Sequence, residues 1–390
     1  MALNKEIFFY VASFLADVGI GILIIAVPLV AIKTGASPFA LGLIGFFFSL
    51  FYFSLSYLFG RVADKKGSFA LTITGCVIVL FVSPIFLFSV PIVYIFVLMG
   101  LMGAGMAMFW SPIEAWIAKV SDNLPKSLGY FNISWCAGIS VGSLMGGVLF
   151  EINWRLPFIF TALFSLITIF FLYYCPRALL TPILQNVIEK KTDKLENPFI
   201  LVAWIGNFIA WFGIGTIRYL FPKLAVSLGI TPFILGVLMF LLTGIQAFIS
   251  YVLGRISKWH DRFNFLIFAQ ILMGIGFLIP YFASSTLMFF CAFTLIGVGI
   301  GVVYFFSIYY SLAAGHSMGE RGGVHEALVG LGGLVGPLMG GIVAQNFNIR
   351  APFLLCTMMM LGGIVIEKII MKNRDSDHFI MDEQKTANIS

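Results

Sequence analysis

Long apolar stretches, separated by short polar segments, recur along the whole chain. About twelve of them hold roughly 20 or more residues, the length that crosses about 30 Å of hydrocarbon as an α-helix. This pattern predicts an all-α membrane protein with twelve transmembrane helices. The expected helices lie near 7–32, 39–59, 69–89, 92–117, 128–150, 156–174, 199–222, 233–253, 265–282, 286–312, 325–345 and 351–370.

Composition also indicates a lipid environment. Hydrophobic residues make up 60% of the 390 residues and charged residues only 10%, whereas roughly a quarter of the residues in a soluble domain are charged. Glycine and proline interrupt many of the apolar stretches. Transmembrane helices tolerate both residues because neighbouring groups satisfy the freed backbone hydrogen bonds. A large soluble core is therefore excluded.

Basic residues are distributed unevenly between the two sides that twelve helices would create. Four of the 23 Lys and Arg residues fall on one side, namely Lys33, Arg155, Lys223 and Arg350. Nearly all the others fall on the side of the chain ends. Cytoplasmic loops are enriched in Lys and Arg, so we expect a multi-pass protein of the cell membrane with both termini in the cytoplasm. The net charge of +6 then reflects topology and contact with anionic membrane lipids, not nucleic-acid binding.

The two halves of the sequence repeat one another. The run G-x-S-P-F-A-L-G at 35–42 returns 194 residues later as G-x-T-P-F-I-L-G at 229–236, and the glycine-rich run at 138–147 returns at 332–341. Such a duplication predicts two similar six-helix bundles that face each other, with a site between them. We expect an N-terminal bundle over 1–175, a cytoplasmic linker over 176–198, a C-terminal bundle over 199–371 and a cytoplasmic tail over 372–390.

Several motifs resemble those of the major facilitator superfamily. The loop G-R-V-A-D-K-K-G at 60–67 is similar to that family's signature G-x-L-A-D-R-x-G-R-K. The pattern G-x-x-x-G-P-x-x-G-G of the family's exporters is complete at 332–341, and in the fifth helix Ser143 replaces its proline. The arginine that drug/proton antiporters of this family carry in the fourth helix is absent, since Met99 stands there. The resemblance implies two pseudo-symmetric bundles, transport by alternating access, and an efflux type of transporter.

Glycines four residues apart form a flat stripe on the fifth and eleventh helices. Another helix backbone can approach such a stripe closely. Packing alone is one interpretation; packing that also lets the two halves rock against each other is a compatible one. The stripe residues are Gly138, Gly142 and Gly146 in the first half and Gly332, Gly336, Pro337 and Gly340 in the second.

The basic loop after the second helix predicts a latch between the halves. Its Asp64 could cap the positive end of the eleventh helix, an interaction worth at most about 1–2 kcal/mol. A solvated turn that only sets topology is the alternative. The expected latch residues are Gly60, Arg61, Asp64, Lys65, Gly67 and Arg321.

Acidic residues inside the apolar stretches are candidate functional groups, because a charge at membrane depth costs several kcal/mol. Asp17 is expected to line a central cavity and to bind protons or a cationic substrate; a neutral acid bonded to a neighbouring helix is the alternative. Glu114 lies among Trp110 and Trp116, a cluster suited to an organic cation. Interfacial tryptophans around a glutamate that reaches water would explain the same sequence. The repeat places Trp211 at the position equivalent to Asp17.

Five other polar residues complete the candidate substrate and proton site. His325 and Glu326 could pass protons near neutral pH; alternatively, Glu326 caps its helix or pairs with Arg321. Arg218 is an external gate, an anion contact or an anchor at the membrane surface. Asn207 and Gln246 could add hydrogen bonds in a cavity.

No metal-ligand, phosphate-loop or nucleophile pattern occurs in the sequence, so we expect no enzyme activity, cofactor or metal. The chain is predicted to be a monomeric secondary active transporter. Proton-coupled export of a small hydrophobic or cationic molecule is the first hypothesis. A uniporter or importer of a sugar, organic acid or other metabolite is the alternative. A membrane enzyme and a receptor or scaffold fit the sequence less well.

Overall fold

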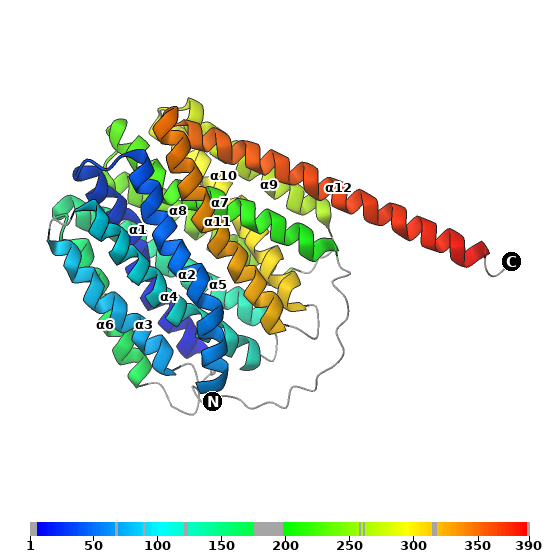
Figure 1. The fold of residues 1–390 in the computed structure, drawn as a ribbon, viewed down its shortest axis with the longest axis horizontal. Coiled ribbons are helices and arrows are strands. Elements are labelled where there is room, and N and C mark those ends of the chain that lie inside the picture. Colours follow the sequence, from blue (N-terminus) through cyan, green and yellow to red (C-terminus); the bar gives the residue numbers. More distant parts are fainter. Residues whose placement is uncertain are drawn as a thin grey trace.

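The protein folds into a bundle of long α-helices (Figure 1). The computed structural model describes the backbone of residues 6–66, 69–88, 91–120, 124–174, 198–256, 259, 262–313 and 318–387. Twelve of its helices are long and apolar enough to cross a membrane, which confirms the predicted number. In the first half these are α1 (Ile7–Lys33), α2 (Pro38–Lys66), α3 (Phe69–Val82), α4 (Ile92–Val120), α5 (Leu124–Ile152) and α6 (Leu156–Tyr173). In the second half they are α7 (Pro198–Ser227), α8 (Pro232–Leu253), α9 (Phe263–Phe282), α10 (Thr286–Ala313), α11 (Met318–Asn346) and α12 (Ala351–Ala387).

Several helices differ from their expected ranges; for example, α2 continues to Lys66 and α11 already begins at Met318. The helix expected at 69–89 ends at Val82 and continues as a 3₁₀ helix, η1 (Ser83–Leu87), because Pro84 near its start cannot continue the α-helical hydrogen bonds. Helix α12 continues to Ala387, through most of the expected tail, and leaves the bundle at the red end of the chain (Figure 1). The expected linker lies outside the described residues, apart from Pro198 at the start of α7.

The duplicated runs fold in the same way in both halves. Gly35 follows α1 with φ +87 and Gly229 follows α7 with φ +73, a conformation that glycine adopts without a steric penalty. Ser37 and Thr231 then accept a hydrogen bond from the backbone N–H three residues later, at 3.2 Å and 3.3 Å. The same turn and the same hydroxyl cap therefore start α2 and α8.

The glycine stripes pack helices of the same half together. A methyl group added at Gly142 of α5 would lie 2.1 Å from the carbonyl oxygen of Val18 in α1. A methyl group added at Gly336 of α11 would lie 2.0 Å from the carbonyl oxygen of Phe212 in α7. Only a hydrogen fits at these positions, so the stripes fix α5 on α1 and α11 on α7.

The two halves meet along α5 with α8 and along α2 with α11. We call the end of the bundle at which α1 begins the terminal end and the other the opposite end. Near the opposite end, a methyl group at Gly147 would lie 2.5 Å from the carbonyl oxygen of Pro232. One at Gly42 would lie 2.3 Å from that of Pro337. Backbones of the two halves thus touch directly at the opposite end.

Polar contacts also join the halves there. The Lys223 ammonium donates to the carbonyl oxygen of Ala36, and the backbone N–H of Phe233 donates to Glu151 Oε1 at 2.9 Å. Toward the terminal end, α5 and α8 remain close, since a methyl group at Gly129 would lie 3.8 Å from the Cα of Gly254. The structure therefore has the halves in contact near both ends.

Candidate functional site

Three acids from both halves lie in the interior, on helices that meet at the boundary. Asp17 comes from α1, Glu114 from α4 and Glu326 from α11. Asp17 is 1% exposed, and its Oδ2 has no hydrogen-bond partner. Glu114 Oε1 is also buried without a partner. The unpartnered oxygens of Asp17 and Glu114 are available for a ligand or a proton.

The glycine stripe creates the space for Asp17. A methyl group at Gly138 would lie 2.8 Å from the Asp17 Cβ, and one at Gly332 would lie 2.8 Å from the Trp211 Cβ. Asp17 and Trp211 thus occupy equivalent places in the two halves, as the repeat indicates. One half presents a carboxyl group there and the other an indole.

Glu326 is the most connected of the three acids. Tyr52 of α2 donates its hydroxyl to Glu326 Oε2 at 3.0 Å. His325 Nε2 is 3.6 Å from Glu326 Oε1, and its Nδ1 is 2.8 Å from the Ser307 hydroxyl. Tyr52 of α2 and His325 of α11 thus approach this carboxylate, and Ser307 of α10 contacts the His325 ring.

A row of aromatic rings crosses from one half to the other beside these acids. Trp110 meets Trp135 with ring centroids 5.7 Å apart, Trp135 meets Tyr304 at 5.5 Å, and Tyr304 meets Trp211 at 6.1 Å. All three contacts are edge-to-face, the geometry that the ring quadrupoles favour. We call Trp110, Trp135, Tyr304 and Trp211 the aromatic row.

Arg218 of α7 faces the boundary between the halves. Its Cζ lies 5.2 Å from the centroid of the Trp211 ring, and it interacts electrostatically with Asp17. It also lines a cavity of about 10 Å³ together with residues of α1, α5, α7 and α8, among them Ser143 and Thr243. The guanidinium thus belongs to the interior, next to the aromatic row.

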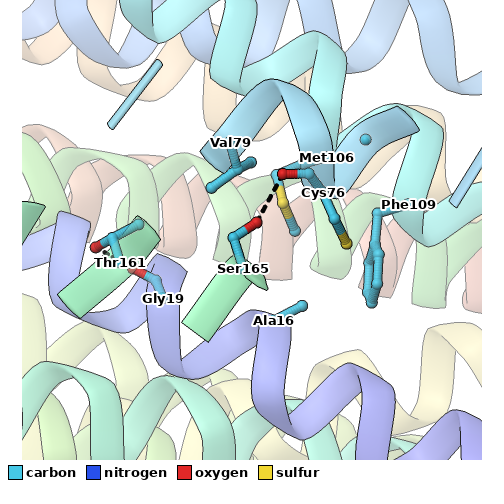
Figure 2. Close-up of a pocket in the computed structure, with 9 residues that line it drawn as sticks. Ala16, Gly19, Cys76, Val79, Met106, Phe109, Thr161 and Ser165 are labelled. Atoms are coloured by element: carbon cyan, nitrogen blue, oxygen red, sulfur yellow. Dashed lines mark hydrogen bonds between the residues drawn. The ribbon is translucent and has the colours of Figure 1, made fainter. Parts of the chain in front are cut away.

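A second cavity of about 10 Å³ lies inside the first half, between α1, α3, α4 and α6 (Figure 2). Ala16, Gly19 and Phe109 line it, and the Ser165 hydroxyl donates to the Cys76 carbonyl oxygen at 2.7 Å across it. A hollow of this size holds about one water molecule. It is a packing feature of one bundle and is separate from the acids at the boundary.

Other residues that the sequence singled out are placed differently. Asn207 is fully buried, and both atoms of its amide are unpartnered; Gln246 is 3% exposed, with an unpartnered Nε2. Gly60 has open space around it, and Arg61 is exposed. The side chains of Trp116, Asp64, Lys65 and Arg321, and Gly67 itself, lie outside the described residues, so the latch stays a prediction.

Sequence reasoning missed Tyr52, Trp135 and Tyr304. A signal existed, because an aromatic residue with a polar tip is unusual away from the membrane surface unless that tip finds a partner. Trp135 finds one at Asn132, whose Oδ1 accepts from its Nε1 at 3.1 Å. It also missed Glu367, a fully buried acid of α12 that accepts from Gln270 at 2.9 Å inside the second half.

Two bacterial resistance proteins are similar in sequence to nearly the whole chain. It is 25% identical over 371 residues to Multidrug resistance protein 1 of Bacillus subtilis (strain 168), covering 90% of this chain and 92% of that protein. It is 24% identical over 395 residues to Quinolone resistance protein NorA of Staphylococcus aureus, covering 95% of this chain and 98% of that protein.

Solved structures share the fold. The human organic anion transporter MFSD10 (TETRAN) superposes with a TM-score of 0.71 at 16% identity, over 94% of this chain and 100% of that one. A bacterial homolog of the human lysosomal transporter Spinster, inward-facing and occupied, gives a TM-score of 0.76 at 13% identity, over 94% and 96%. The family model described as Major Facilitator Superfamily matches residues 9–325 and 203–378. The chain is therefore a multi-pass membrane transporter that belongs to the major facilitator superfamily.

Proposed function

We propose that the protein is a proton-coupled exporter of small hydrophobic or cationic molecules, that it works by alternating access, and that its terminal end faces the cytoplasm. The names of the matched relatives, a multidrug and a quinolone resistance protein, support export of such molecules. The shortage of basic residues at the opposite end supports the orientation.

One observation carries the proton coupling: Asp17 is buried between helices, and its Oδ2 has no hydrogen-bond partner. A carboxylate at membrane depth whose oxygen accepts no hydrogen bond costs several kcal/mol, so a group that binds this oxygen stabilises the site. A proton from one side of the membrane or a cationic substrate from the other supplies that group. Because only one of them is needed at a time, the two can exchange there.

The aromatic row supports a hydrophobic or cationic substrate. A cation over an indole face gains about 0.5–2 kcal/mol, and the larger value applies where water is excluded. The rings of the row contact one another in this structure. A substrate therefore reaches them only when the halves part, which is what alternating access provides.

The test is transport in proteoliposomes with an imposed pH gradient. For Asp17→Asn, we expect loss of the stimulation by the gradient, because the amide cannot bind a proton in the pH range of the assay. Glu367→Gln is the matched control, since this buried acid lies inside the second half. Full stimulation in Asp17→Asn would remove Asp17 from the coupling mechanism.

Arg218 supports a second candidate, a uniporter or importer of an organic acid or other metabolite. Its guanidinium lines the cavity between the halves, where it can contact an anion. Counterflow of a labelled organic acid without any pH gradient, lost in Arg218→Gln, would favour this function over export.

A further inference from the structure

The Arg218 guanidinium lacks acceptors for its hydrogen-bond donors. A guanidinium stays protonated in proteins and carries a planar fork of N–H groups that can only donate. Within the part of the chain that the structure describes, these groups donate no hydrogen bond, and the Cζ lies 5.2 Å from the centroid of the Trp211 ring. An aromatic face attracts the positive charge. It leaves the N–H groups free to donate to a ligand.

The guanidinium lines a small cavity at the boundary between the halves. The cavity measures about 10 Å³ and is enclosed by α1, α5, α7 and α8, so both halves contribute to its wall. A hollow of this size holds about one particle of the size of a water molecule. Of the described residues that line it, Arg218, Ser143 and Thr243 are polar. The apolar ones are Ile24, Ile139, Ile214, Ile217, Met239 and Leu242.

Two contacts between α5 and α8 bound the cavity. Toward the opposite end, a methyl group added at Gly236 would lie 2.6 Å from the carbonyl oxygen of Ser143, so the two backbones touch there. Toward the terminal end, the hydroxyl oxygens of Ser140 and Thr243 are 2.8 Å apart. The cavity therefore lies between two direct contacts of the halves, and a particle inside it is enclosed by both.

Ser143 supplies a second donor to the cavity. It replaces the proline of the exporter glycine pattern, and its equivalent in the second half is Pro337. Its hydroxyl donates to a backbone carbonyl oxygen of α1 at 3.4 Å, which is long for a hydrogen bond. The Thr243 hydroxyl donates to a carbonyl oxygen of its own helix at 2.9 Å. Ser143 is thus the hydroxyl that can turn and donate into the cavity beside Arg218.

These donors fit a small anion. The position equivalent to Arg218 in the first half is Ile24, which lines the same cavity and brings no charge to balance the guanidinium. Asp17 interacts with the guanidinium electrostatically but is not among the described lining residues, so it leaves the hollow free. A cation is repelled there, and a carboxylate with its carbon atoms exceeds the space. A weakly hydrated monatomic anion loses least on entering such apolar surroundings.

We propose that Arg218 and Ser143 form a binding site for one chloride ion, enclosed between the two halves. The bound ion accepts hydrogen bonds from α7 of the second half and α5 of the first. It therefore stabilises the conformation in which the halves are in contact, because a ligand favours the state that binds it. The site goes beyond both candidate functions, since chloride is here a resident ligand and not the transported substrate.

The test measures the melting temperature of the purified protein while chloride replaces gluconate at constant pH and ionic strength. Gluconate is too large for a hollow of one water molecule. In the wild type, we expect a rise that saturates with chloride concentration. The rise should disappear in Arg218→Gln. In Ser143→Ala, the half-saturating chloride concentration should increase about tenfold or more, the effect of losing one hydrogen bond to a charged group.

Lys223→Gln is the matched control, because it removes the other positive charge of α7. Lys223 contacts the carbonyl oxygen of Ala36 and is not among the described residues that line the cavity, so this variant should respond to chloride like the wild type. In crystals grown with bromide in place of chloride, an anomalous difference peak should lie within hydrogen-bonding distance of Arg218 and Ser143.

Three results would each overturn the chloride site. They are an equal response of the wild type to chloride and gluconate, an undiminished response in Arg218→Gln, and a cavity that holds water but no bromide. None of these measurements uses a substrate or a pH gradient. Their failure therefore leaves proton-coupled export in place, and loss of that function leaves the chloride site in place.

Discussion

Gly147→Ala should shift the balance between the two access states without unfolding the protein. The added methyl group would lie 2.5 Å from the carbonyl oxygen of Pro232, across the boundary between the halves. An ordinary carbon–oxygen contact is about 3.4 Å, so the halves must part by about 0.9 Å at this point. Overpacking of this kind costs about 1–3 kcal/mol. Only the conformation closed at the opposite end pays it, so the open population should rise about 5- to 150-fold.

Gly142→Ala is the matched control. Its methyl group would lie 2.1 Å from the Val18 carbonyl oxygen, but α1 and α5 belong to the same half and move together. The penalty then applies in both conformations, and the protein loses thermal stability without a shift between them. Labels at Ile152 and Ser227, both exposed at the opposite end, report that distance in a background without the five native cysteines. A wider distance in Gly142→Ala than in Gly147→Ala would refute this reasoning.

Further changes should act through single contacts. Gly35→Ala should destabilise the protein by about 1–2 kcal/mol and so lower its melting temperature, because φ is +87 at a position that no atom crowds. Gly362→Ala is equally uncrowded but lies in an ordinary helix, so its melting temperature should not fall. Arg350→Gln should cost about 2 kcal/mol in thermal stability, because its guanidinium donates to carbonyl oxygens at the end of α9, including that of Pro280 at 3.1 Å. Trp211→Ala should weaken ethidium binding about 2- to 30-fold in a fluorescence titration; unchanged affinity would remove this ring from the substrate site.

Most of the fold follows from the sequence because a bilayer imposes one rule on every span. A helix must satisfy its backbone internally, so apolar length alone predicts where it lies. The repeat adds the local turns, and Gly35 and Gly229 adopt the same left-handed conformation. Helix ends are harder to predict. Pro84 shortens α3, whereas polar residues beyond Lys372 continue α12, because neither end is fixed by the width of the hydrocarbon.

The site was only partly predictable. Charge inside an apolar stretch identifies Asp17, Glu114 and Glu326 one at a time. Their placement on helices of both halves that lie at the boundary depends on how the two bundles pack, which no local pattern encodes. The glycine stripes show the same limit, because spacing predicts a flat face on α5 but not that its partner is α1 of the same half.

Transport by the wild-type protein in proteoliposomes tests the central claim most directly. With an acidic lumen and the terminal end of the protein facing outward, ethidium should accumulate inside, and a proton ionophore should abolish the accumulation. Accumulation that is the same with and without the pH gradient, or no movement of the cation at all, would contradict proton-coupled export through the interior of the two halves.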